Sequence, residues 1–141
     1  MEDIKLVKDL AFGETAKSQV LTGVEKLTNA VGSTLGASGK CVIIEDNTGA
    51  PQITKDGVTV ADSVILLDPV ENMGAKLMKE AARKTVREAG DGTTTATVLA
   101  HAILTEAYKV IKSENPRQLK EGINLAVDKV VHYLEKHSSH V

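Results

Sequence analysis

The chain has 141 residues, of which 42% are hydrophobic and 26% are charged. This supply of aliphatic residues is enough for one packed core and argues against global disorder. The formal net charge of −2 argues against a nucleic-acid or membrane-surface partner, and the single cysteine, Cys41, excludes an intramolecular disulfide.

The first predicted helix runs from Glu14 to Leu35, and Gly36 is a plausible stop signal for it. Its apolar residues recur at three- and four-residue steps and form one stripe. The stripe comprises Val20, Val24, Leu27, Val31 and Leu35. A loop of small residues, Leu35–Gly39, follows the helix.

A β-hairpin is predicted next. Two short runs, Cys41–Ile44 and Pro51–Thr54, flank the turn-forming segment Glu45–Gly49. An isolated hairpin leaves its strand edges open, so the segment 41–53 could pair with another chain.

Two helices are predicted after the hairpin. The segment Val58–Leu66 is short and apolar, and we interpret it as a short helix. Asp68 and Pro69 are typical of a helix start, as the cap and the first residue of a helix that runs to Ala89. Its imperfect apolar face contains Val70, Met73, Leu77, Ala81 and Val86.

The last two helices are predicted from Thr93 to Ile111 and from Pro116 to Lys136, the second one capped by Asn115. Their apolar stripes are Ala96, Leu99, Ile103, Ala107 and Val110 in the first helix and Leu119, Ile123, Val127, Val130 and Leu134 in the second. The predicted fold is therefore mostly α, with five helices and one small β-hairpin. No shift in composition marks a second domain.

The segment Gly90–Ala96 is the most informative for function. Its two glycines allow the backbone to approach a ligand closely, and three threonines sit where a helix presents free N–H groups and its positive dipole end. These features are typical of a phosphate site. Asp91 would repel phosphate unless a cation such as Mg²⁺ lies between them. The alternative is that Thr93–Thr95 only cap a helix.

Two other loops have a similar character. Thr34–Gly39 could wrap phosphates with backbone N–H groups, and Lys55 with Asp56 could supply a cation and a carboxylate. Each is weak evidence alone, because the first could be a helix C-cap and the second a surface turn.

Four motifs resemble those of group I chaperonins, the GroEL family. They are Gly49–Val58, Glu71–Ala75, Gly90–Leu99 and Asn115–Ile123, and the resemblance runs from about Phe12 to the end of the chain. It implies a helical equatorial domain that binds nucleotide, in subunits that form rings and use ATP to fold proteins. By this resemblance, residues 1–136 are the N-terminal segment of the equatorial domain. Residues 137–141 would begin the connection to an intermediate domain.

The resemblance also implies roles for individual residues. Asp91 would hold Mg²⁺, and the phosphates would contact Gly92, Thr93, Thr94 and Thr95. The other side of the ATP would be lined by Thr34, Leu35 and Gly36. Asp56 would lie near the terminal phosphate and assist catalysis, and a potassium ion would bind near Thr34, Lys55 and Thr94.

Partners and location follow from the same resemblance. The family implies a ring of identical subunits joined through hairpin 41–53, unfolded client proteins and a co-chaperonin. The location is expected to be cytoplasmic, with an organelle matrix or a phage origin as alternatives.

The chain departs from the family pattern at one loop and in length. The family's first loop usually reads Leu-Gly-Pro-Lys-Gly, whereas this chain has Ala37 and Ser38 in place of Pro and Lys, which predicts altered nucleotide affinity. The chain stops where the family enters its intermediate domain. We therefore expect ATPase activity from a full-length subunit and little from these 141 residues alone. The alternative function is a short, non-catalytic binding or assembly module.

Overall fold

The computed structural model describes residues 9–46 and 48–139, and these contain five helices and one antiparallel pair of strands. The elements are α1 (Gly13–Gly32), β1 (Val42–Glu45), β2 (Pro51–Thr54), α2 (Gly57–Ser63), α3 (Pro69–Ala89), α4 (Thr93–Val110) and α5 (Pro116–His137). The mostly helical fold with one hairpin is thereby confirmed. None of the described helices is long and apolar enough to cross a membrane.

The chain forms two compact units, which divide within α4 after Ala102. The first unit contains α1 to α3, the hairpin and the start of α4. The second unit contains the end of α4 and α5, and α5 has no buried residue. The predicted boundary between residues 136 and 137 falls inside α5, and residues 140 and 141 lie outside the described residues.

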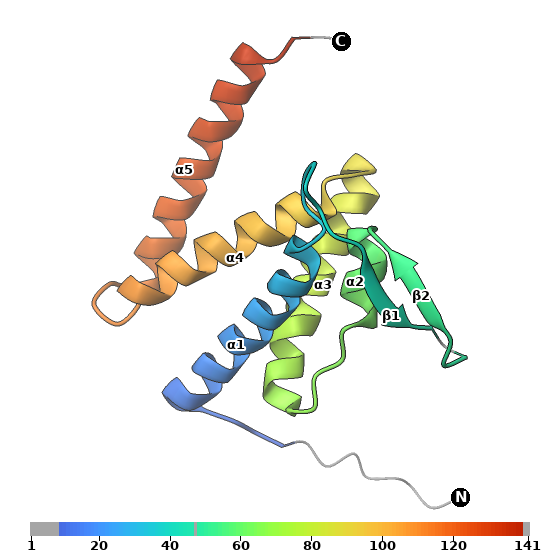
Figure 1. Cartoon of the computed structure of the whole chain (residues 1–141). Helices are drawn as coiled ribbons and strands as arrows, with labels where there is room; N and C mark the ends of the chain where they lie inside the picture. The colour runs from blue at the N-terminus through green and yellow to red at the C-terminus, as the bar shows by residue number, and fades with distance from the viewer. Residues whose placement is uncertain (1–8, 47, 140–141) are drawn as a thin grey trace, which may run out of the picture. The chain divides into compact units, whose positions relative to one another are not determined.

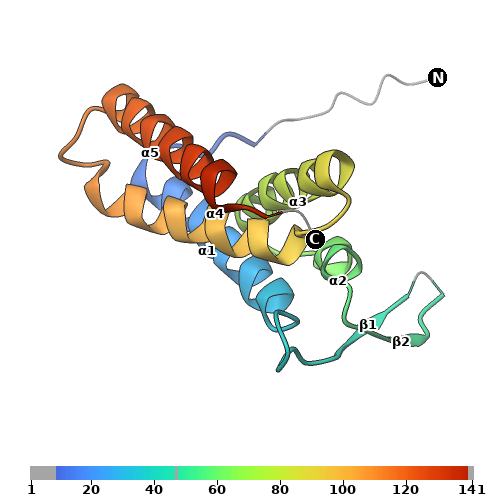
Figure 2. The ribbon, with the colours of Figure 1, turned by 90° about the horizontal axis from the view of Figure 1, so that it is seen from above.

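The core of the first unit lies between α1, α2 and α3 (Figure 1). Its buried side chains come from the predicted stripe of α1, from the middle of α2 and from one face of α3. They are Val24, Leu27, Val31, Val60, Ala61, Ala75 and Met78. The hairpin projects from the end of this unit where α2 lies (Figures 1 and 2), with Ile43 paired to Ile53 across the strands.

The predicted buried face of α3 is wrong. Met73 and Leu77 are more than half exposed, whereas the buried residues are small or lie one position later: Gly74, Ala75, Met78 and Ala82. Close contact between helix backbones explains the difference. A Cβ atom on Gly74 would lie 2.1 Å from the carbonyl oxygen of Val20 in α1, so only glycine allows this approach.

The predicted buried face of α4 is also wrong, for a different reason. Thr93 and Thr97 are its buried residues, while Leu99 and Ile103 are exposed. The Thr97 hydroxyl donates a hydrogen bond to the Thr93 carbonyl, 2.8 Å away. This bond satisfies the buried hydroxyl, so a threonine can occupy the buried face of the helix although the hydrophobic pattern did not include it.

Two of the predicted helices extend too far at their C-terminal ends. α1 ends at Gly32 rather than Leu35, because a tighter turn closes when the Thr34 N–H donates to the Val31 carbonyl at 3.1 Å. Likewise, α2 spans Gly57–Ser63 rather than 58–66. The early end of α1 releases the segment 34–36 from the helix, and this segment lines the site described next.

Candidate functional site

Three loops of the first unit surround one pocket of about 300 Å³. The first follows α1, the second connects β2 to α2, and the third connects α3 to α4. The lining residues are Thr34, Leu35, Gly36, Lys55, Asp56, Gly57, Asp91, Gly92, Thr93, Thr94 and Thr95. All ten residues predicted for the nucleotide and metal site therefore lie around the same pocket.

The first loop is folded back on itself after α1. The Lys40 N–H donates to the Ser33 carbonyl at 2.8 Å, and the Gly39 N–H donates to the Gly36 carbonyl at 3.0 Å. Gly36 has φ +73°, which favours glycine, and no atom lies within 4 Å of the place where a Cβ would stand. The pocket wall at Gly36 is thus bare backbone.

The third loop turns the chain into α4. Gly90 and Gly92 both have positive φ angles, +78° and +88°, and α4 begins directly afterwards at Thr93. Asp91 is exposed, and its Oδ1 accepts a hydrogen bond from the Gly92 N–H at 2.6 Å. The N-terminal end of an 18-residue helix, with its free N–H groups, therefore lies at the pocket.

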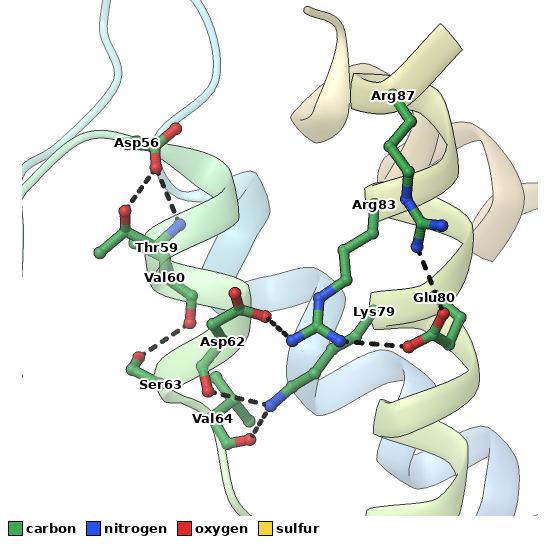
Figure 3. A network of polar contacts seen from close by, with 10 residues as sticks. All are labelled: Asp56, Thr59, Val60, Asp62, Ser63, Val64, Lys79, Glu80, Arg83 and Arg87. Atoms are coloured by element: carbon green, nitrogen blue, oxygen red, sulfur yellow. Dashed lines mark hydrogen bonds and ion pairs between the residues drawn. The ribbon is translucent and has the colours of Figure 1, made fainter. Parts of the chain in front are cut away.

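The second loop brings Lys55 and Asp56 to the pocket and begins α2. Asp56 is the cap of that helix: its Oδ2 accepts hydrogen bonds from the Thr59 N–H at 2.9 Å and from the Thr59 hydroxyl (Figure 3). These bonds, the one from the hydroxyl above all, lower the pKa of Asp56 below its ordinary value. Asp56 therefore has a structural role as the cap of α2 and also lines the pocket.

The lowered pKa of Asp56 gives a pH-dependent prediction. Asp56→Ala should lower the free energy of unfolding by about 1 kcal/mol near neutral pH, because the helix cap is lost. A carboxylate with a lowered folded-state pKa stabilises the protein above its unfolded pKa of 3.8 and loses this effect as the pH falls through the folded value. The difference in unfolding free energy between wild type and Asp56→Ala should therefore shrink as the pH falls below 3.8.

Urea unfolding at neutral pH and at about pH 3 measures this difference. Asp56→Asn is the matched control, because asparagine also caps helices and does not titrate. A difference between wild type and Asp56→Ala that stays constant from neutral to acid pH would contradict the assignment.

Gly57 is the one lining residue missing from the predicted set. A Cβ atom at this position would lie 2.4 Å from the Thr94 Oγ1, so α2 begins in direct contact with the first turn of α4. The signal in the sequence was the glycine after Lys55-Asp56, but a turn glycine does not reveal which distant helix it contacts.

The formal charges of the pocket side chains sum to −1, from one lysine and two aspartates. An anionic phosphate ligand would be repelled by this balance unless a cation came with it. Among the residues that the structure describes, no group of three or more His, Cys, Asp or Glu side chains could hold a metal ion. Mg²⁺ at phosphate sites uses one or two carboxylates together with phosphate oxygens, and the donor set of this pocket fits that arrangement.

Comparisons with known proteins agree on one family. Residues 27–141 match the model of the TCP-1/cpn60 chaperonin family. The mitochondrial heat shock protein 60 of Saccharomyces cerevisiae is 50% identical over 135 residues, which is 95% of this chain and 24% of that protein. The chain thus spans about a quarter of the length of this relative.

A solved structure shows the same likeness in three dimensions. It is the crystal structure of the chaperonin gp146 from bacteriophage EL 2 (Pseudomonas aeruginosa), determined in the presence of ATP-BeFx. The two chains are 33% identical with a TM-score of 0.77, and the match covers 92% of this chain and 22% of the phage chain.

Proposed function

The chain belongs to the TCP-1/cpn60 chaperonin family, and from this premise we propose that it is the N-terminal nucleotide-binding and ring-assembly segment of an ATP-dependent protein-folding chaperonin. Residues 1–136 would form part of the equatorial domain, and residues 137–141 would begin the connection to the intermediate domain. In the whole subunit, ATP binding would drive the conformational change that folds client proteins, with a co-chaperonin as a further partner.

The observation that carries this proposal is the convergence of three loops on one pocket. Phosphates would bind the N-terminal end of α4, where N–H groups and the threonine hydroxyls of Thr93–Thr95 are available as donors. The backbone at Gly36 would face the same ligand from the other side. A solved relative prepared with ATP-BeFx supports this choice of ligand.

The metal assignments follow from the donor atoms. Asp91 would hold Mg²⁺, which neutralises phosphate charge when it is bound. A potassium ion would use the hydroxyls of Thr34 and Thr94. Lys55 would contribute its backbone carbonyl to that ion, since its ammonium has no lone pair to offer.

Asp56 would act as an assisting residue near the terminal phosphate. Its Oδ2 accepts two hydrogen bonds from Thr59 (Figure 3), and these bonds fix the orientation of the carboxylate. The other carboxylate oxygen points away from Thr59 in the same view. That oxygen would face the attacking water or the phosphate.

The hairpin supports a role in assembly. Ile43 and Ile53 are a cross-strand pair on one face, about 70% exposed each, and the sheet has only two strands within the described residues. Exposed β-branched residues beside open strand edges favour pairing with another copy of the subunit. This observation also favours the second candidate function, a non-catalytic assembly module. We also propose a cytoplasmic location, with an organelle matrix or a phage origin as the alternatives.

Calorimetric titration of the 141-residue chain with ATP tests the proposal. With Mg²⁺ present, we expect one saturable site per chain. Without Mg²⁺ the affinity should fall by about 100-fold or more, because two carboxylates then face the phosphates directly. Binding that is equal with and without Mg²⁺ would contradict the metal role, and no binding in either case would contradict nucleotide binding by this chain.

A further inference from the structure

The short helix α2 joins the pocket to a polar network on α3. It has seven residues, too few for an isolated helix to be stable in water. Its first residue, Gly57, lies against Thr94 at the pocket. Any movement of α2 along or across its axis would therefore change the pocket wall.

The far end of α2 is held by Lys79 of α3 (Figure 3). The Lys79 ammonium donates hydrogen bonds to the carbonyl oxygens of Asp62, at 3.1 Å, and Val64, at 2.6 Å. The last carbonyls of a helix have no partner within the helix. Lys79 supplies donors to the chain at this end, where α2 stops and the extended segment begins.

Arg83 adds a second connection from α3 to the same turn. Its Nη2 lies 2.8 Å from the Asp62 Oδ1, and its Nη1 donates to Glu80 at 3.1 Å. The Arg83 and Asp62 side chains are each more than 40% exposed, so this ion pair contributes less than the bonds of Lys79.

Burial distinguishes Lys79 from the surface lysines of α3. Partial burial lowers the pKa of Lys79, against the opposing effect of the nearby Asp62 carboxylate. A lysine that is partly removed from water loses hydration, and the two carbonyl acceptors replace it. Between the two ends of α2, Val60 and Ala61 are buried in the core.

We infer that Lys79 is a positioning residue for the nucleotide pocket: by holding the C-terminal end of α2, it keeps Asp56 and Gly57 in place against Thr94. This inference rests on the proposed function for the nature of the ligand. The mechanical link between Lys79 and the pocket wall is independent of the proposed function.

Lys79→Met removes the donors and keeps a long, unbranched side chain. We expect the Mg-ATP affinity of the full 141-residue chain to fall by about three- to tenfold. Lys79→Arg should stay within about twofold of wild type, because arginine keeps the positive charge and offers N–H donors on a long side chain. Lys84→Met is the matched control, since Lys84 lies on α3 in an exposed pair with Glu88 at 3.8 Å.

Two readouts decide the inference. Calorimetry gives the Mg-ATP affinity of each variant, and amide hydrogen exchange without ligand gives the protection of Thr59 and Val60 near the pocket end of α2. We expect weaker binding and faster exchange in Lys79→Met alone, with a circular dichroism spectrum like that of wild type. Equal affinity in wild type and Lys79→Met would overturn the inference.

The exchange readout separates this inference from the proposed function. If wild type itself binds no Mg-ATP, the proposed function fails, and the link is then judged by exchange alone. Unchanged protection of Thr59 and Val60 in Lys79→Met would overturn the inference. Faster exchange in Lys79→Met, together with wild-type exchange rates in Lys79→Arg, would support it.

Discussion

Gly23→Ala should destabilise the first unit strongly, although alanine is the better helix former. A Cβ atom at position 23 would lie 1.8 Å from the Glu71 carbonyl oxygen, which is backbone of α3 and cannot rotate away. α1 and α3 would have to separate, which would disturb the core between them. We expect a loss of about 3 kcal/mol, corresponding to a decrease in melting temperature of the order of 10 °C.

The sign of the effect makes this test specific. In a helix without close neighbours, replacing glycine by alanine stabilises by up to about 1 kcal/mol. Gly32→Ala, in the same helix, is the control: its Cβ would meet only the Val98 Cγ2 at an ordinary 3.6 Å. Thermal unfolding followed by circular dichroism compares the two variants. Equal stability of Gly23→Ala and wild type would show that the helices do not approach this closely.

Asp91→Ala should abolish most Mg-dependent nucleotide binding while leaving the helix content unchanged. The aspartate is exposed and is the proposed Mg²⁺ ligand, so its removal leaves the cation only the phosphate oxygens and weaker donors. We expect the affinity for Mg-ATP to fall by about 100-fold, since ligand loss removes a charge-assisted contact of roughly 3 kcal/mol.

Two further variants separate the charge of Asp91 from its role in the turn. In the wild-type chain the Gly92 N–H donates to the Asp91 carboxylate at 2.6 Å. Asp91→Asn keeps an oxygen that can accept this hydrogen bond but removes the charge. It should resemble Asp91→Ala in calorimetry with Mg-ATP. Asp128→Ala removes the same charge from an exposed position on α5 and should bind like wild type. Unchanged Mg-ATP affinity in Asp91→Asn would mean that Asp91 holds no metal.

The individual loops that line the candidate site were predictable from the sequence because their signals are local. Gly36, Gly90 and Gly92 mark the loops that need positive φ angles, and Asp68 marks a helix start by capping. Asp56 was expected as a surface turn residue, and the structure adds that it caps α2. These features depend on a few neighbouring residues. Their convergence on one pocket was not derivable from those signals, and the expectation of it depended on the family resemblance.

The buried faces of α3 and α4 could not be predicted in the same way. A hydrophobic pattern selects Met73 and Leu77, but contact between backbones selects Gly74 and Ala75. This choice depends on Gly23 and Val20, which are about 50 positions away in the sequence. The early end of α1 was missed because Leu35 continues the apolar period beyond the last helical turn.

Amide hydrogen exchange of the wild-type chain, with and without Mg-ATP, tests the proposed nucleotide site most directly. We expect added Mg-ATP to slow exchange in three separate segments, residues 34–36, 55–57 and 91–95. Slower exchange only outside these segments, or no change in the amides of Gly92 to Thr95, would contradict it.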